Sequence, residues 1–176
     1  MPTSIKKTPA LEGRIREMTA NDWDSVAAIY TEALLNGGAS YETDCPDYAF
    51  WDKGHLTTCR YVFEQDGKVV GWTALTPFSY RKVYSGVAEI GIYLFKEFTG
   101  KGIGKALLQR IMDDAFSSGI WTLQASIFSD NAASLALFYS CGFRTVGYRE
   151  KIGMTHLGEW KDTVLLEKRK PVDDHG

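Results

Sequence analysis

A glycine-rich turn has the residue types and spacing that suggest ligand chemistry. Residues 100–105 read GKGIGK and separate an Ile- and Tyr-rich segment from a segment whose apolar residues recur at helical spacing. Glycines let a backbone turn sharply and approach a ligand closely. Free N–H groups at the start of the following helix attract anions. We therefore expect a phosphate or pyrophosphate site here, with a turn that binds nothing as the alternative.

Two common phosphate-binding motifs do not fit this turn. A P-loop that ends at Gly104-Lys105 needs glycine at position 99 and Ser or Thr at position 106, where the chain has Thr99 and Ala106. A dinucleotide fingerprint that starts at Gly100 needs a third glycine at position 105, which is lysine. Neither nucleotide-binding class is therefore indicated.

Glu89 is the candidate general base. It lies within the apolar segment 88–95, where burial would raise its pKa toward neutrality. Strand alternation places Glu89, Gly91 and Tyr93 on one face. A solvated strand glutamate is the alternative interpretation.

The composition indicates an ordinary globular protein. The chain has 176 residues with 44% hydrophobic and 24% charged residues, which fits a single domain, expected over 13–170 with tails at 1–12 and 171–176. A net charge of −2 argues against a broad nucleic-acid surface, and no apolar run could span a bilayer. The three cysteines lack metal-ligand spacing, so no metal is expected. Their odd number and the lack of a signal peptide favour a cytoplasmic location.

The predicted elements alternate in a way typical of a mixed α/β fold. Strands are expected over 14–18, 60–65, 68–76, 88–95, 121–127, 144–150 and 160–168. Helices are expected over 19–35, 47–55, 102–118 and 131–140. Hairpins early in the chain and helices between strands later predict a mixed sheet with helices on both faces.

Two motifs together give the chain a family resemblance. The turn at 100–105 and the segment from Asn131 to Gly142-Phe143 resemble the two motifs of the GNAT superfamily of N-acetyltransferases. Tyr41-Glu42, residues 71–78 and residues 158–162 look like its phosphinothricin and methionine sulfoximine branch. The chain departs from these patterns at Thr99, where Gln or Arg is commonest, and at Phe138 and His156.

The resemblance implies acetyl-CoA as co-substrate and a sheet of about seven strands, splayed between 88–95 and 121–127. The pantetheine would lie along the backbone of Ile92, Tyr93 and Leu94, and a backbone N–H near Ile92 would stabilise the oxyanion. The implied cofactor-binding set is Ile92, Tyr93, Leu94, Thr99, Gly100, Lys101, Gly102, Ile103, Gly104, Lys105, Asn131, Ser134 and Phe138.

The general acid is less well defined. The superfamily often has Tyr, and the branch often has His, where this chain has Phe138, which cannot donate a proton. Tyr139 could substitute, although it lies about 100° further around the helix. Water is the other candidate, and core packing is the favoured alternative for Phe138. The catalytic set is therefore Glu89 and Tyr139.

The acceptor side is also assigned from the resemblance. Tyr30, Tyr41 and Glu42 are expected to line the acceptor pocket. Arg81 and Lys82 are candidates to bind acidic groups of the acceptor, with ordinary solvated charges as the alternative. His156 stands where the branch commonly has lysine, which leaves the identity of the acceptor open.

The function expected from the resemblance is transfer of acetyl from acetyl-CoA to the amino group of a small amino-acid-like molecule in a ternary complex. A homodimer is expected, without nucleic-acid or membrane partners. The alternatives are a non-catalytic acyl-CoA sensor and an acetyltransferase of protein amino groups.

Overall fold

The computed structural model describes residues 11–171, and the tail residues 1–10 and 172–176 lie outside the described residues. The helices are α1 (Trp23–Leu35), α2 (Tyr48–Gly54), α3 (Ile103–Ser117) and α4 (Ala132–Ser140), with short 3₁₀ turns at Ala20–Asp22, Lys82–Tyr84 and Lys96–Phe98. The strands are β1 (Arg14–Glu17), β2 (Tyr61–Gln65), β3 (Lys68–Pro77), β4 (Val87–Leu94), β5 (Thr122–Phe128), β6 (Arg144–Met154) and β7 (Trp160–Arg169).

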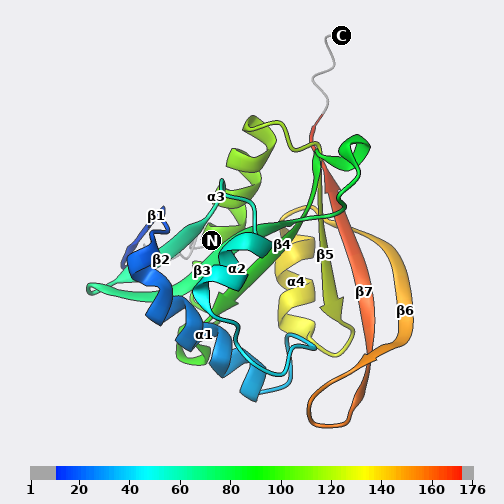
Figure 1. Cartoon of the computed structure of the whole chain (residues 1–176), viewed down its shortest axis with the longest axis horizontal. Helices are drawn as coiled ribbons and strands as arrows, with labels where there is room; N and C mark the ends of the chain where they lie inside the picture. Colours follow the sequence, from blue (N-terminus) through cyan, green and yellow to red (C-terminus); the bar gives the residue numbers. More distant parts are fainter. Residues whose placement is uncertain (1–10, 172–176) are drawn as a thin grey trace, which may run out of the picture.

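The strands form one seven-stranded mixed sheet in the order β1-β2-β3-β4-β5-β7-β6. Only the β4–β5 pair is parallel, and the other pairs are antiparallel. Helices cover both faces (Figure 1). Residues of α1 and α2 pack in one apolar cluster with Trp72 and Ala74 of β3, whereas residues of α3 and α4 pack in another. The predicted fold class is confirmed.

The sheet is splayed at its middle. β4 pairs with β5 only where Val87–Glu89 face Thr122–Gln124. Beyond Glu89 the two strands diverge, while β5 stays paired with β7 as far as Phe128 and β4 stays paired with β3 as far as Leu94. One edge of β4 from Ile90 onward therefore lacks a neighbouring strand, at the place where the sequence predicted the splay.

β6 is longer than predicted. The sequence indicated a strand that stops at residue 150, followed by a loop, but β6 continues to Met154. Its register shifts between Arg149 and Gly153, where Lys151 adopts a φ of 44° and donates its N–H to Asp162 Oδ1 at 2.7 Å. This irregularity bends the strand without ending it.

None of the described helices has the length and apolar character needed to cross a membrane.

Candidate active site

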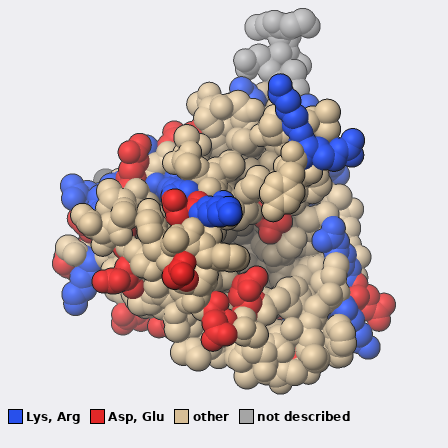
Figure 2. Space-filling view, viewed as in Figure 1, with Lys and Arg blue, Asp and Glu red and all other residues tan. Residues whose placement is uncertain are grey.

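Two cavities flank β4 and meet beside it. The first, of about 500 Å³, is lined by Glu89 and Gly91 of β4, by the loop after α1 and by Phe128 and Thr163 of β5 and β7. The second, of about 570 Å³, is lined by Ile92 and Leu94, the glycine turn and α4. Ala39 and Tyr93 line both cavities, so the two spaces adjoin at these residues. Figure 2 shows a hollow on this face, with acidic side chains below and to the left and basic side chains on its right.

The glycine turn presents free backbone donors to the second cavity. Gly100 and Gly102 have φ values of +74° and +89°, a region that glycine enters without steric cost. Gly102 is the N-cap of α3 and no described side chain caps it. The first intrahelical bond runs from Ala106 N–H to Gly102 O at 3.1 Å, so the N–H groups of residues 103–105 precede the bonded turn. Uncapped donors with the helix dipole behind them suit a phosphate.

Asn131 connects α4 to the loop between the cavities. Its Oδ1 accepts the Ser134 N–H at 3.1 Å and caps α4, and its Nδ2 donates to Gly38 O at 3.1 Å. Asn131 is therefore the N-cap of α4. Asn131 also lines the second cavity, but both ends of its amide already have protein partners.

Glu89 lies in the first cavity as a half-buried carboxylate. Its Oε2 accepts a hydrogen bond from Gln124 Nε2 at 3.1 Å. Burial raises the pKa of Glu89, and the Gln124 bond and the positive charge of Arg149 partly oppose that rise. A carboxyl group with a raised pKa, open to a cavity, has the properties of a general base that works near neutral pH.

Aromatic rings form most of the remaining wall. Tyr93 lies 4.9 Å, between ring centroids, from both Tyr30 and Trp72. Burial raises the pKa of Tyr30 and of Tyr93, so both hydroxyls stay protonated at neutral pH. His55 stacks on Trp51 at 4.1 Å. The result is a pocket that combines aromatic rings with the carboxylates of Glu42, Asp44 and Glu89.

Most of the expected cofactor-binding residues line the second cavity. These are Ile92, Tyr93, Leu94, Thr99, Gly100, Gly102, Gly104, Lys105, Asn131 and Ser134. Three others lie elsewhere. Ile103 and Phe138 are buried in the core, where Phe138 packs against Phe143, and Lys101 lies over the ring of Phe98.

Tyr139 does not face either cavity. Its side chain is half-exposed, and its hydroxyl lies 2.8 Å from Thr145 Oγ1 of β6. The helix register that buries Phe138 turns the next residue away from the cleft. The expectation that Tyr139 substitutes as the acid is therefore not supported by its position.

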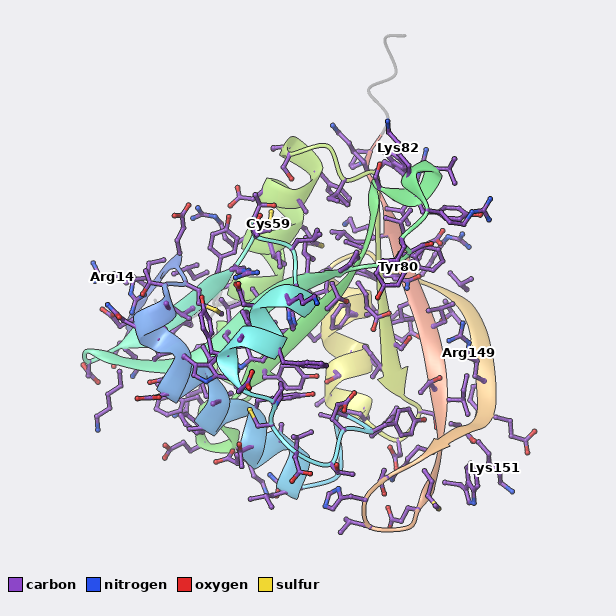
Figure 3. All side chains as sticks on the ribbon, viewed as in Figure 1. Arg14, Cys59, Tyr80, Lys82, Arg149 and Lys151 are labelled. Carbon is purple, nitrogen blue, oxygen red and sulfur yellow. The ribbon has the colours of Figure 1, made fainter. Side chains whose placement is uncertain are left out.

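The expected acceptor-side residues divide into two groups. Tyr30, Tyr41 and Glu42 line the first cavity. Arg81 and Lys82 do not, because the 3₁₀ turn that follows β3 carries them to the end of the sheet, where Arg81 lies over the ring of Tyr84. Figure 3 shows Lys82 at that end. His156 is exposed in the β6–β7 hairpin and does not line the cavity either.

Sequence reasoning missed three residues of this site. Gln124 is the register partner of Glu89 on β5, a relation that alternation within one strand cannot show. His55 reaches the cavity because α2 docks onto β3, where Leu56 N–H bonds Leu75 O at 2.8 Å. Arg149 affects Glu89 from β6, three strands away in the sheet order. The position of Arg149 relative to Glu89 follows only from the order and register of the strands.

The chain is similar in sequence to known acetyltransferases. The chain is 29% identical over 165 residues to phosphinothricin N-acetyltransferase of Alcaligenes faecalis, covering 88% of this chain and 81% of that protein. It is 27% identical to the L-methionine sulfoximine/L-methionine sulfone acetyltransferase of Salmonella typhimurium, covering 92% and 95%.

A solved structure extends the similarity to three dimensions. The phosphinothricin acetyltransferase of Sinorhizobium meliloti, solved in complex with acetyl-CoA, superposes with a TM-score of 0.83 at 30% identity, covering 93% of this chain and 95% of that one. The sequence model of the acetyltransferase (GNAT) family matches residues 23–143. With its splayed sheet and uncapped glycine turn, the chain belongs to the GNAT family of N-acetyltransferases.

Proposed function

We propose that this enzyme transfers acetyl from acetyl-CoA to the amino group of a small amino-acid-like acceptor, of the phosphinothricin or methionine sulfoximine type. One observation carries the proposal: the cavity with the uncapped glycine turn adjoins the cavity with Glu89 at Tyr93 and Ala39. A thioester held in the cavity with the glycine turn would present its carbonyl to an amine held in the cavity with Glu89. This arrangement supports direct attack in a ternary complex.

The residues present fit acetyl-CoA. The free N–H groups of residues 103–105 suit its pyrophosphate. The edge of β4 from Ile90 to Leu94, which lacks a strand partner on the β5 side, suits a pantetheine bound in the manner of a strand. Lys105 lines the same cavity and adds a positive charge.

Each chemical step then has a candidate group. Glu89 accepts the proton of the acceptor ammonium, directly or through a water, and the neutral amine attacks the thioester carbon. A backbone N–H near Ile92 stabilises the oxyanion. As the carbon–sulfur bond breaks, the nitrogen gives up its second proton to water and becomes the amide nitrogen, and the leaving thiolate takes a proton from water. An assigned acid is less necessary because a thiolate is a weak base.

The size and lining of the first cavity, here called the acceptor cavity, support a small acceptor. Residues 39–42 of the loop after α1 line it, and Tyr41 reaches across to donate its hydroxyl to Lys161 O at 3.0 Å. A volume of about 500 Å³ under this loop suits a free amino acid analogue better than an extended polypeptide.

We also propose that the enzyme is a homodimer that pairs through the β6–β7 hairpin. Apolar side chains of this hairpin are half-exposed or more, among them Ile152, Met154, Leu157 and Trp160. Several exposed apolar side chains on one hairpin are typical of an interface.

The test is thiol release from acetyl-CoA with methionine sulfoximine, methionine sulfone, phosphinothricin and unrelated amines. Glu89→Gln should lower kcat about a hundredfold or more while the Kd of acetyl-CoA stays unchanged. Tyr139→Phe is the matched control, since its hydroxyl lies outside both cavities, and should leave kcat within about twofold.

The rivals predict other results. Tight acetyl-CoA binding without turnover on any amine would favour the acyl-CoA sensor. Turnover on peptide N-termini alone would favour an acetyltransferase of protein amino groups.

A further inference from the structure

The acceptor cavity has an unbalanced charge. Its described lining includes the carboxylates of Glu42, Asp44 and Glu89, but no arginine or lysine. The three carboxylates attract the ammonium group of an amino-acid acceptor but repel its carboxylate. If the acceptor is amino-acid-like, a cation close to this cavity must offset that repulsion.

The sheet register identifies the cations that share a face with Glu89. Residues directly opposite each other on paired strands project to the same side of a sheet. Glu89 is opposite Gln124, which is opposite Glu167, which is opposite Arg144. Strand alternation then places Lys161, Thr163 and Arg169 of β7 on this face, and Arg149 is opposite Thr163.

Three of these four cations already have partners. Lys161 Nζ lies 2.6 Å from Asp130 Oδ2 and 3.3 Å from Glu159 Oε2. Arg144 is paired with Glu167. Arg149 forms no ion pair or side-chain hydrogen bond with any residue in the described range 11–171. Arg169 donates from Nη1 to Thr122 Oγ1 at 3.2 Å, and neither residue lines the acceptor cavity. Among the cations of β7 and β6 on this face, Arg149 is therefore the one whose guanidinium has no described partner.

Arg149 also lies beside the acceptor cavity. Its register partner Thr163 lines the acceptor cavity, and so does Phe128, the partner of Thr163 on β5. Its positive charge opposes the rise in the pKa of Glu89, so its field reaches the carboxylate of the candidate base. Figure 3 shows Arg149 on β6, on the hairpin that borders the hollow seen in Figure 2.

We propose that Arg149 is a specificity-determining residue that binds the carboxylate of the acceptor and thereby selects amines that carry an acidic group. The inference rests on the proposed acetyl transfer and names the residue that defines its substrate class. The planar guanidinium can hold a carboxylate through two parallel N–H···O bonds, which fix the orientation of the bound molecule. Held at the β6 side, the acceptor would direct its amino group toward Glu89.

The experiment compares two acceptors that differ only in the acidic group: L-methionine sulfone and its primary carboxamide. Loss of a charge-assisted bond predicts that Arg149→Gln lowers kcat/KM for the carboxylate about ten- to a hundredfold, mainly through KM. The value for the carboxamide should stay within about twofold. Arg149→Lys should restore part of the carboxylate preference. Arg144→Gln, on the same strand and face but already paired with Glu167, is the matched control and should change neither.

The outcomes separate this inference from the proposed function. Equal losses with both acceptors, or no loss with either, would overturn the role of Arg149 while leaving acetyl transfer intact. Failure of the wild-type enzyme to acetylate either molecule would overturn the amino-acid-like acceptor and, with it, the inference. Calorimetric titration of L-methionine sulfone into the CoA complex gives a second readout, and Arg149→Gln must weaken that binding about tenfold or more.

Discussion

At the scale of single residues, the environment of Glu89 decides its chemistry. Burial raises its pKa, while the Gln124 hydrogen bond and the Arg149 charge limit the rise. A carboxylate with a raised pKa is a stronger base than an ordinary glutamate. The acid limb of the kcat/KM profile should accordingly lie above the ordinary range of a glutamate.

The raised pKa also predicts how stability depends on pH. Folding favours the protonated form of Glu89, so its contribution is fully present below the pKa of the unfolded chain and is lost as pH rises through the folded-state pKa. Gln cannot ionise. Glu89→Gln should therefore gain in free energy of unfolding, relative to the wild type, as pH rises from 4 toward 8. Urea midpoints at several pH values measure this difference, and a difference that shrinks with rising pH would contradict it.

At the scale of elements, the start of α3 supplies the backbone donors of the proposed phosphate site. Gly102 has a positive φ and caps α3 without a side chain, which leaves the first N–H groups of the helix free. A side chain at this position would strain the backbone and shift those donors.

Gly102→Ala should therefore raise the KM of acetyl-CoA about tenfold and lower stability by about 1 kcal/mol. Gly119→Ala is the control at the other end of α3, because Gly119 also has a positive φ, of 103°, and lies outside both cavities. It should have a similar effect on stability and leave KM unchanged. An equal rise in KM for both variants would show that general strain, and not the turn, is responsible. Steady-state kinetics and thermal denaturation supply the readouts.

At the scale of the whole molecule, the β6–β7 hairpin borders the acceptor cavity and also exposes apolar side chains. Gly153 lies directly under the ring of Tyr41, which ties the hairpin to the loop over the cavity. Trp160 and Met154, paired in register, are 59% and 52% exposed. A second copy packed on this surface would hold the hairpin, and with it Arg149, in place.

We expect light scattering to give about twice the mass of the 19.7 kDa chain. The double variant Met154→Lys, Trp160→Lys should yield monomer, because two buried charges oppose an apolar interface. Val83→Lys, at an equally exposed apolar residue on the opposite end of the sheet, should leave the mass unchanged. A wild-type protein of single-chain mass would overturn the proposed dimer.

Local sequence patterns determined most of the fold and half of the site. The period of the apolar residues, the Asp66-Gly67 turn and the glycines at 100–104 depend on neighbours close in the chain, so the strands, the helices and the glycine turn before α3 could be predicted. Strand alternation likewise placed Glu89 with Gly91 and Tyr93, and all three line the acceptor cavity.

The tertiary structure alone decided which charged and polar side chains meet Glu89. Arg81 and Lys82 are nearer to Glu89 in the sequence than Arg149 is, yet the turn after β3 carries them away from the cavity. Gln124 and Arg149 lie on the same face as Glu89 because β5, β7 and β6 pair in one particular register. The irregularity in β6 was not predicted from its sequence. Such pairing joins residues distant in the chain, and no local pattern encodes it.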